Sequence, residues 1–158
     1  MNQSAKPFPS PPPAESDDAL RTETTTGAIG YRLRRAQLSV FQKFLAFFDE
    51  FKLRPAEYSV LVLIDDNPGR KQTEIAEVLG IKRANFVTLV HGLEERGLVE
   101  RSSSPQDKRA NALHLTSTGQ EFLANARAMH EAMEADLVAR LGGQAARDRL
   151  LALLDRLT

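Results

Sequence analysis

The sequence predicts a mainly α-helical chain with one β-hairpin, in the order ααααββαα. Three observations carry this prediction. Apolar residues recur at helical spacing over most of residues 28–157, two short β-type runs lie at Leu98–Ser102 and Ala112–Leu115, and the polar stretch 103–111 joins these runs as a hairpin loop. The 158 residues suit a domain of ordinary size with extensions.

The composition excludes several classes of protein. Because the chain has no cysteine, disulfides, thiolate zinc ligands and thiol redox sensing are excluded. No apolar run is long enough to span a membrane and no secretory signal pattern begins the chain, so we expect a cytoplasmic protein without membrane association. The net charge is zero, but residues 70–115 hold eight basic and six acidic residues, which permits binding to nucleic acid.

Residues 1–27 are expected to form a disordered tail, because they hold five of the eight prolines and only isolated hydrophobic residues. A long helix is expected from Ala28 to Phe51, with five phenylalanines within eleven positions. This apolar stripe is too broad for one surface helix of a small domain. We therefore interpret residues 28–54 as a dimerisation helix, with a core within one subunit as the alternative.

The remaining helices have clear sequence boundaries. A helix begins at Pro55 and stops at the turn signal 65–69, and two more are expected over Gln72–Leu79 and Arg83–Arg96. After the hairpin, a long helix starts near Thr116 and ends at Gly142-Gly143. Its expected capping box pairs Ser117 with Gln120, or Thr118 with Glu121. The last helix is expected over Gln144–Leu157, and residues 117–158 are expected to dimerise.

Residues 72–90 have the pattern of a helix-turn-helix. Ala76 is small enough for two helices to cross closely, and Gly80 tolerates the left-handed backbone that the turn needs. The apolar positions that hold both helices to the core are Ile75, Leu79, Ile81, Phe86, Leu89 and Leu93. A plain helical hairpin shares part of this pattern, but not the polar-tipped β-hairpin that follows. Residues 55–116 are therefore predicted to be a winged helix-turn-helix DNA-binding domain.

The second helix of this motif is expected to enter the major groove with its leading end. Arginine matches guanine and asparagine matches adenine, while a threonine methyl group can contact thymine. Each candidate side chain has the alternative role of a solvated surface residue. The expected DNA contacts on this helix are Lys82, Arg83, Ala84, Asn85, Thr88 and His91.

Three motifs, at residues 92–101, 104–110 and 113–119, resemble the signature of the MarR family of transcriptional regulators. The resemblance in helix order extends over residues 28–158 and implies an obligate homodimer. It also implies that the wing residues Asp107, Lys108 and Arg109 serve DNA binding, with the arginine in the minor groove and the aspartate shaping the loop. The chain departs from the family at Thr88, where arginine is frequent, and at Gly92, which is a poor helix former.

The resemblance implies a repressor that leaves an inverted-repeat operator when it binds a small aromatic carboxylate, a phenolic compound or an acyl-CoA thioester. An aromatic and cationic wall would suit such a ligand. The candidate effector-binding residues are Tyr31, Arg34, Arg35, Leu38 and Tyr58. In the alternative, Arg34 and Arg35 are solvated or pair with acids across the dimer.

Other functions find little support in the sequence. There is no Gly-x-Ser-x-Gly turn and no glycine-rich phosphate loop, and the adjacent acids Asp65-Asp66 and Glu94-Glu95 cannot flank a substrate, so an enzyme is not expected. His91, His114 and His130 lack metal-ligand spacing, so neither a metal nor another cofactor is expected. The alternatives that stay open are a winged helix that binds protein, and a regulator without a small-molecule effector.

Overall fold

The computed structural model of the chain describes the backbone of residues 22–104 and 107–157, with side chains over residues 22–102 and 112–157. Contacts divide the chain into two units, residues 1–36 and 37–158. The described residues form helices and one two-stranded antiparallel sheet, as the sequence predicts. None of the described helices combines the length and apolarity that crossing a membrane requires.

The first unit contains a short helix, α1 (Glu23–Thr26), and the beginning of α2 (Ile29–Phe47). The Gly27 N–H closes α1 on the Glu23 carbonyl at 2.9 Å, and Arg32 Nε donates to the Thr26 carbonyl at 2.5 Å. This helix lies inside the segment 1–27 that is predicted to be disordered, and these local hydrogen bonds are the reason for the difference. The rest of that segment, 1–21, lies outside the described residues.

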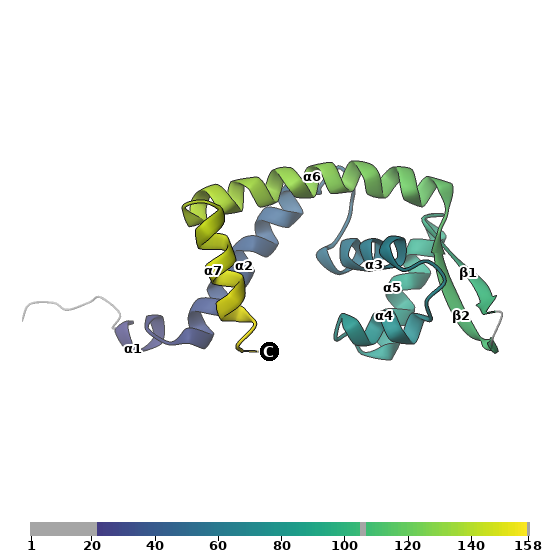
Figure 1. Ribbon diagram of the computed structural model, residues 1–158, viewed down its shortest axis with the longest axis horizontal. Helices are drawn as coiled ribbons and strands as arrows, with labels where there is room; N and C mark the ends of the chain where they lie inside the picture. Colours follow the sequence, from purple (N-terminus) through teal and green to yellow (C-terminus); the bar gives the residue numbers. More distant parts are fainter. Residues whose placement is uncertain (1–21, 105–106, 158) are drawn as a thin grey trace, which may run out of the picture. The chain divides into compact units, whose positions relative to one another are not determined.

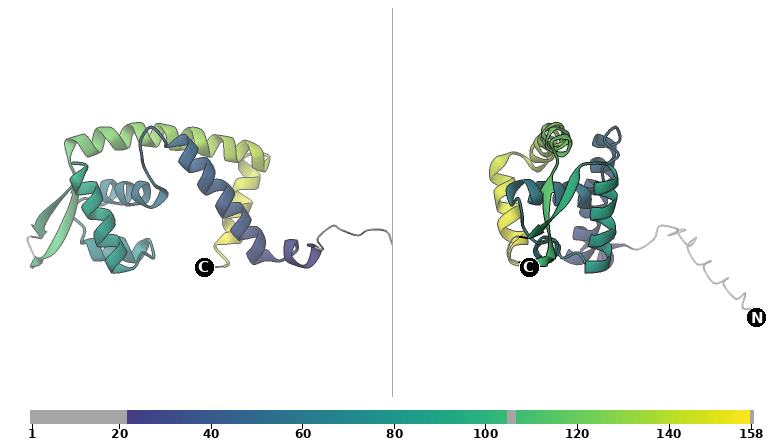
Figure 2. Two further views of the ribbon diagram at one scale, coloured as in Figure 1. Left: turned by 180° about the vertical axis from the view of Figure 1, so that it is seen from behind. Right: turned by 90° about the vertical axis from the view of Figure 1, so that its right-hand side faces the viewer.

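The second unit contains the rest of α2 and the remaining elements, which Figure 1 and Figure 2 show. They are α3 (Pro55–Asp66), α4 (Gln72–Val78), α5 (Arg83–Glu95), β1 (Val99–Ser104), β2 (Asp107–Leu115), α6 (Ser117–Leu141) and α7 (Gln144–Leu154). Helices α3, α4 and α5 gather beside the β1–β2 hairpin, and α6 leads away from the end of β2.

A closed apolar core lies among α3, α4, α5, the hairpin and α6. Its fully buried side chains include Leu61, Ile64, Phe86, Leu113 and Leu123. The six positions predicted to hold the helix-turn-helix to the core all join this cluster, three of them buried and three half-buried. Burial of an aliphatic or aromatic side chain contributes about 1.5–3 kcal/mol, so this core stabilises the unit strongly.

Two helices of this core begin with the same device. The Glu57 carboxylate accepts a hydrogen bond from the Arg54 N–H at 2.7 Å, and the Glu74 carboxylate accepts one from the Lys71 N–H at 2.8 Å. Each acid lies in the first turn of its helix, α3 or α4, where a negative charge also favours the helix dipole. Pro55 fits the first position of α3, since no intrahelical N–H is needed there.

Several predicted boundaries are wrong. Helix α2 ends at Phe47 and not at Phe51, because a turn follows that still directs Phe48 and Phe51 toward the core. The last helix ends at Leu154 and not at Leu157. The strands extend into the predicted loop 103–111, because cross-strand backbone pairing continues there despite the polar composition.

The cap of α6 also differs from the prediction. Neither Ser117 nor Thr118 caps this helix; the Thr116 hydroxyl accepts a hydrogen bond from the Gly119 N–H at 2.9 Å. The same hydroxyl donates to the Gly97 carbonyl at 2.6 Å, which explains why Thr116 is the residue used. Gly142, with a φ of 96°, ends α6 as predicted.

Candidate nucleic-acid interface

The turn between α4 and α5 has the geometry that the sequence predicts. Ala76 is buried, and its carbonyl accepts a hydrogen bond from the Ile81 N–H at 2.9 Å. Gly80 has a φ of 62°, in the left-handed region that favours glycine. Two short-range constraints, a small residue and a glycine, therefore set the crossing of the two helices.

Helix α5 buries one face and exposes the other. Phe86, Val90 and Leu93 are at most 1% exposed. All six predicted DNA contacts on this element are exposed, from Lys82 at the N-cap through Arg83, Ala84, Asn85 and Thr88 to His91. Among the described residues, no hydrogen bond or ion pair engages the side chains of Lys82, Arg83 and Asn85, so these groups are available to a partner.

The two exposed residues further along α5 are partly engaged within the helix. The Thr88 hydroxyl donates to the Ala84 carbonyl at 3.2 Å. His91 Nε2 lies 3.5 Å from a carboxylate oxygen of Glu95, one turn later. The first turn of α5 is thus freer to bind bases than the part that follows.

The wing is an antiparallel pair whose register runs from Val99 opposite Leu115 to Ser103 opposite Asn111, with an irregularity after Ser103. A third segment joins its other edge: the Gly69 N–H donates to the Leu113 carbonyl at 2.9 Å, and Lys71 bridges to Ala112. The predicted wing contacts Asp107, Lys108 and Arg109 belong to β2 by their backbone, and their side chains lie outside the described residues.

The base of the wing is fixed to α5 and α6. Arg101 on β1 pairs with Glu94 on α5 at 2.7 Å. Gly119, in the first turn of α6, lies so close to Leu98 that an added Cβ would be 2.0 Å from the Leu98 carbonyl oxygen. Only glycine permits this approach, which explains the glycine that closes the motif at residues 113–119.

Arg96, at the end of α5, binds the linker between α2 and α3. Its guanidinium donates to the Phe51 carbonyl at 2.9 Å and to the Lys52 carbonyl at 3.3 Å, and it lies over the Phe122 ring at 5.1 Å. Lys52 has a φ of 46°, a conformation that side-chain-bearing residues rarely adopt. The contact ties the end of α5 to the linker and to α6.

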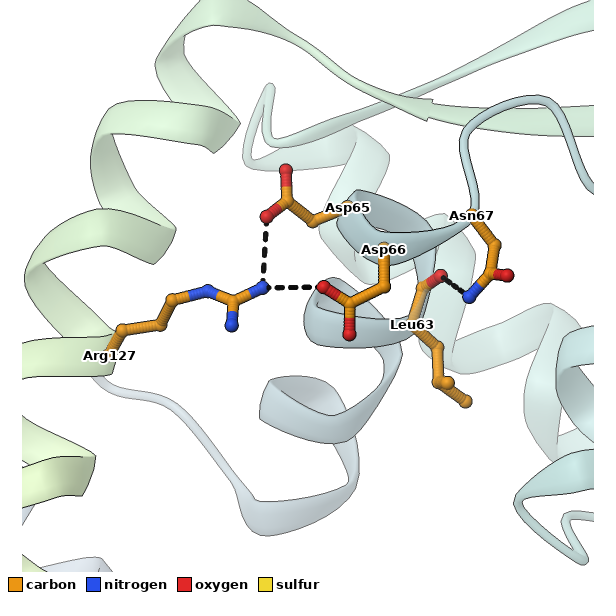
Figure 3. Close-up of polar contacts among 5 residues, drawn as sticks. All are labelled: Leu63, Asp65, Asp66, Asn67 and Arg127. Carbon is orange, nitrogen blue, oxygen red and sulfur yellow. Dashed lines mark hydrogen bonds and ion pairs between the residues drawn. The ribbon is translucent and has the colours of Figure 1, made fainter.

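Figure 3 shows a second connection, between α6 and the end of α3. One nitrogen of Arg127, Nη2, lies 2.9 Å from a carboxylate oxygen of Asp65 and 3.0 Å from one of Asp66. Burial of the guanidinium lowers its pKa, but the hydrogen bonds and charges of Asp66 and Asp65 outweigh this, so the pKa of Arg127 is raised. Asp65 and Asp66 are thus ion-pair partners, in agreement with a non-catalytic role.

An aromatic cluster lies where α2, α3 and α6 meet. Tyr58 stacks on His130 at 4.6 Å between ring centroids and packs against Phe44 and Phe48. Burial raises the pKa of the Tyr58 phenol, although the charge of Arg127 opposes the shift. Of the candidate effector residues, Leu38 and Tyr58 belong to the second unit.

The other three candidate effector residues, Tyr31, Arg34 and Arg35, belong to the first unit. Arg34 and Arg35 are exposed and Tyr31 is half-buried. Their role in binding an effector stays a prediction. Within the described parts of the chain, no three His, Asp or Glu side chains lie close enough to hold a metal ion.

Sequence reasoning missed one residue of this surface. A hollow beside α5 is lined by Arg54, Ala56 and Glu57 from the start of α3 and by Asn85, Thr88, Leu89 and Gly92 from α5. Arg54 is distant in sequence from the helix-turn-helix, and only the packing of α3 on α5 brings it to this face. Two helices that cross through a short turn, the second with an exposed face, beside an antiparallel hairpin define a winged helix-turn-helix DNA-binding protein.

Comparisons with known proteins agree with this class. The sequence profile of the MarR family matches residues 51–110. A putative transcriptional regulatory protein for the hcr operon of Thauera aromatica is 36% identical over 147 residues, which cover 92% of this chain and 88% of the relative. The transcriptional regulator HosA of Escherichia coli O111:H- is 32% identical over 92 residues, or 58% of this chain and 68% of HosA.

The transcriptional repressor CouR is similar to the chain in structure. CouR bound to a 23-mer DNA duplex superposes with a TM-score of 0.83 at 44% identity, covering 88% of this chain and 98% of that one. CouR bound to p-coumaroyl-CoA superposes with a TM-score of 0.79 at 42% identity, covering 88% and 97%. The chain therefore belongs to the MarR family, and it is a transcriptional regulator and not an enzyme.

Proposed function

We propose that the protein is a homodimeric repressor that binds an inverted-repeat operator and leaves it when it binds an aromatic acyl-CoA thioester. The observation that carries the proposal is the free and exposed leading end of α5, with Lys82, Arg83 and Asn85 unengaged among the described residues. The similarity to CouR, which has been solved on DNA and with p-coumaroyl-CoA, supports the same function.

The dimer is supported by apolar side chains that the chain leaves uncovered. Phe41 and Leu45 on α2 are 44% and 40% exposed, and Leu151, Leu153 and Leu157 in the C-terminal segment are 43%, 49% and 59% exposed. Exposed apolar surface of this kind marks protein–protein contact. A two-fold dimer presents two α5 helices, so its operator should be an inverted repeat with half-sites about 10 bp apart.

The proposal is tested by measuring operator affinity with added ligands. Fluorescence anisotropy with labelled DNA from upstream of the gene should give tight and specific binding. Addition of p-coumaroyl-CoA should then weaken DNA binding by roughly 5–150-fold, the usual range of coupling between two sites. Free p-coumarate and free CoA, tested separately, show which part of the thioester is required.

Two other results would redirect the proposal. Absence of specific DNA binding at low salt would favour a winged helix that binds protein. Tight DNA binding that no aromatic acid, phenolic compound or thioester changes up to millimolar concentration would favour a regulator without a small-molecule effector.

The wing supplies a separate test of DNA binding. We predict that Arg109→Ala weakens operator binding and lowers the magnitude of the salt slope by about 1 per subunit, as loss of one phosphate or groove contact should. Asp107→Ala should weaken binding similarly if Asp107 shapes the loop, although it removes a negative charge. Tighter binding by Asp107→Ala at two salt concentrations would show that the wing is a simple basic patch.

A further inference from the structure

The hollow between the start of α3 and the exposed face of α5 contains one cationic side chain, that of Arg54. Arg54 is exposed, and over the described ranges 22–102 and 112–157 its guanidinium has no hydrogen-bond or ion-pair partner. Asn85 and Thr88, two of the predicted base contacts on α5, line the same hollow. A free guanidinium thus lies beside the face of α5 that is exposed to a partner.

The hydrogen bonds of Arg54 to other described residues use only its backbone. Its N–H donates to the Glu57 carboxylate at 2.7 Å, and its carbonyl accepts from the Tyr58 N–H at 3.0 Å. Both contacts survive replacement of the side chain. The guanidinium is therefore not required for the start of α3, which leaves it available for a ligand.

We infer that Arg54 binds a phosphate of the DNA backbone next to the bases that α5 contacts. A guanidinium binds phosphate with two parallel hydrogen bonds, and such contacts fix the orientation of a protein on the duplex without reading sequence. Glu57 is the one acid lining the hollow, and one of its oxygens already accepts the Arg54 N–H. The inference rests on the proposed binding of an operator by α5.

The experiment compares Arg54→Ala with Arg140→Ala, which removes the same charge from α6, where Arg140 is 69% exposed and pairs with Asp136 one turn earlier at 3.0 Å. Operator affinity is measured for both variants and the wild type between 50 and 200 mM salt, and a non-specific duplex of equal length is measured in parallel. Arg54→Ala should lower the affinity for both duplexes by a similar factor, roughly tenfold or more for the operator. It should also reduce the magnitude of the salt slope by about 1 per subunit. Arg140→Ala should behave like the wild type.

Arg54→Lys keeps the charge and should recover the salt slope with part of the affinity. Thermal melts without DNA should be equal for the wild type and both Arg54 variants, which separates a phosphate contact from a folding role.

An unchanged salt slope in Arg54→Ala would overturn the inference while operator binding by the wild type stands. The same holds if Arg54→Ala loses only its response to p-coumaroyl-CoA, since the guanidinium would then serve a phosphate of CoA. If the wild type itself does not bind the operator, the proposed function fails instead.

Discussion

Helices α5 and α7 are similar in length, with 13 and 11 residues, but they pack in opposite ways. Helix α5 buries Phe86, Val90 and Leu93 almost completely inside the chain. Helix α7 has no buried residue, and Leu150, Leu151 and Leu153 remain 37–49% exposed. The core of the helix-turn-helix is therefore closed within one chain, whereas the C-terminal helix leaves its leucines exposed, and these are the side chains that we propose to lie in the dimer interface.

The largest effect is expected when this apolar face is made polar. In a dimer, Leu151→Ser with Leu153→Ser removes four leucines, each of which still has nearly half of its surface to bury. At about 1 kcal/mol for each leucine, the dissociation constant of the dimer should rise roughly a thousandfold. Analytical ultracentrifugation over a dilution series measures this change.

A matched control for the α7 variant is Val78→Ser. Val78 on α4 is 73% exposed, and the proposed dimer does not bury it, so the oligomeric state should not change. The double variant should retain the folded DNA-binding part, visible as near-native helix content. A double variant that stays dimeric at nanomolar concentration would contradict the role proposed for α7.

A smaller but still large effect is expected at the closed junction between α6 and β1. Gly119→Ala would place a Cβ 2.0 Å from the Leu98 carbonyl oxygen, and this oxygen also accepts the Thr116 N–H. The backbone must shift, so the free energy of unfolding should fall by about 3 kcal/mol. Urea denaturation at fixed protein concentration measures this change, and an unchanged midpoint would show that the junction is looser than the structure indicates.

Replacing Arg96 tests how firmly the end of α5 is joined to the linker before α3 and to α6. Arg96→Ala removes two hydrogen bonds to the Phe51 and Lys52 carbonyls and the contact with Phe122. Since these groups are exposed, we expect a loss of about 1–2 kcal/mol in unfolding free energy. Arg96→Lys should recover little, because lysine lacks the planar fork that reaches both carbonyls. Equal stability of Arg96→Lys and the wild type would show that charge alone suffices.

The same contrast explains what could be predicted from the sequence. The helix-turn-helix was predictable because its requirements are local and steric: Ala76 and Gly80 leave few alternatives for the turn within residues 72–90. The exposed face of α5 followed from helical periodicity alone. The family resemblance added the DNA-binding roles expected of the wing residues, since their composition by itself indicates only a polar hairpin loop.

The features that were missed depend on contacts between distant residues. Thr116, Ser117 and Thr118 are chemically similar candidates for the cap of α6, and the Gly97 carbonyl selects Thr116. Arg54 and Arg96 look like ordinary surface cations in the sequence. Only the packing of the helices brings Arg54 beside α5 and gives Arg96 its partner in the linker before α3. Such choices cannot be read from periodicity.

The smallest predicted effect is at Gly92. Like Gly119, it lies in a helix, so the two positions can be compared. An added Cβ at Gly92 meets no atom within 4 Å, and its φ is not in the left-handed region. Gly92→Ala should therefore stabilise the protein by up to about 1 kcal/mol, since alanine loses less backbone entropy in a helix. Gly92 also lines the hollow that contains Arg54, so operator affinity should be measured beside the urea midpoint. A gain in stability with unchanged affinity is the expected result. A gain in stability with weaker operator binding would show that DNA approaches this part of α5 more closely than one methyl group allows, and would extend the interface from the first turn of α5 to its last.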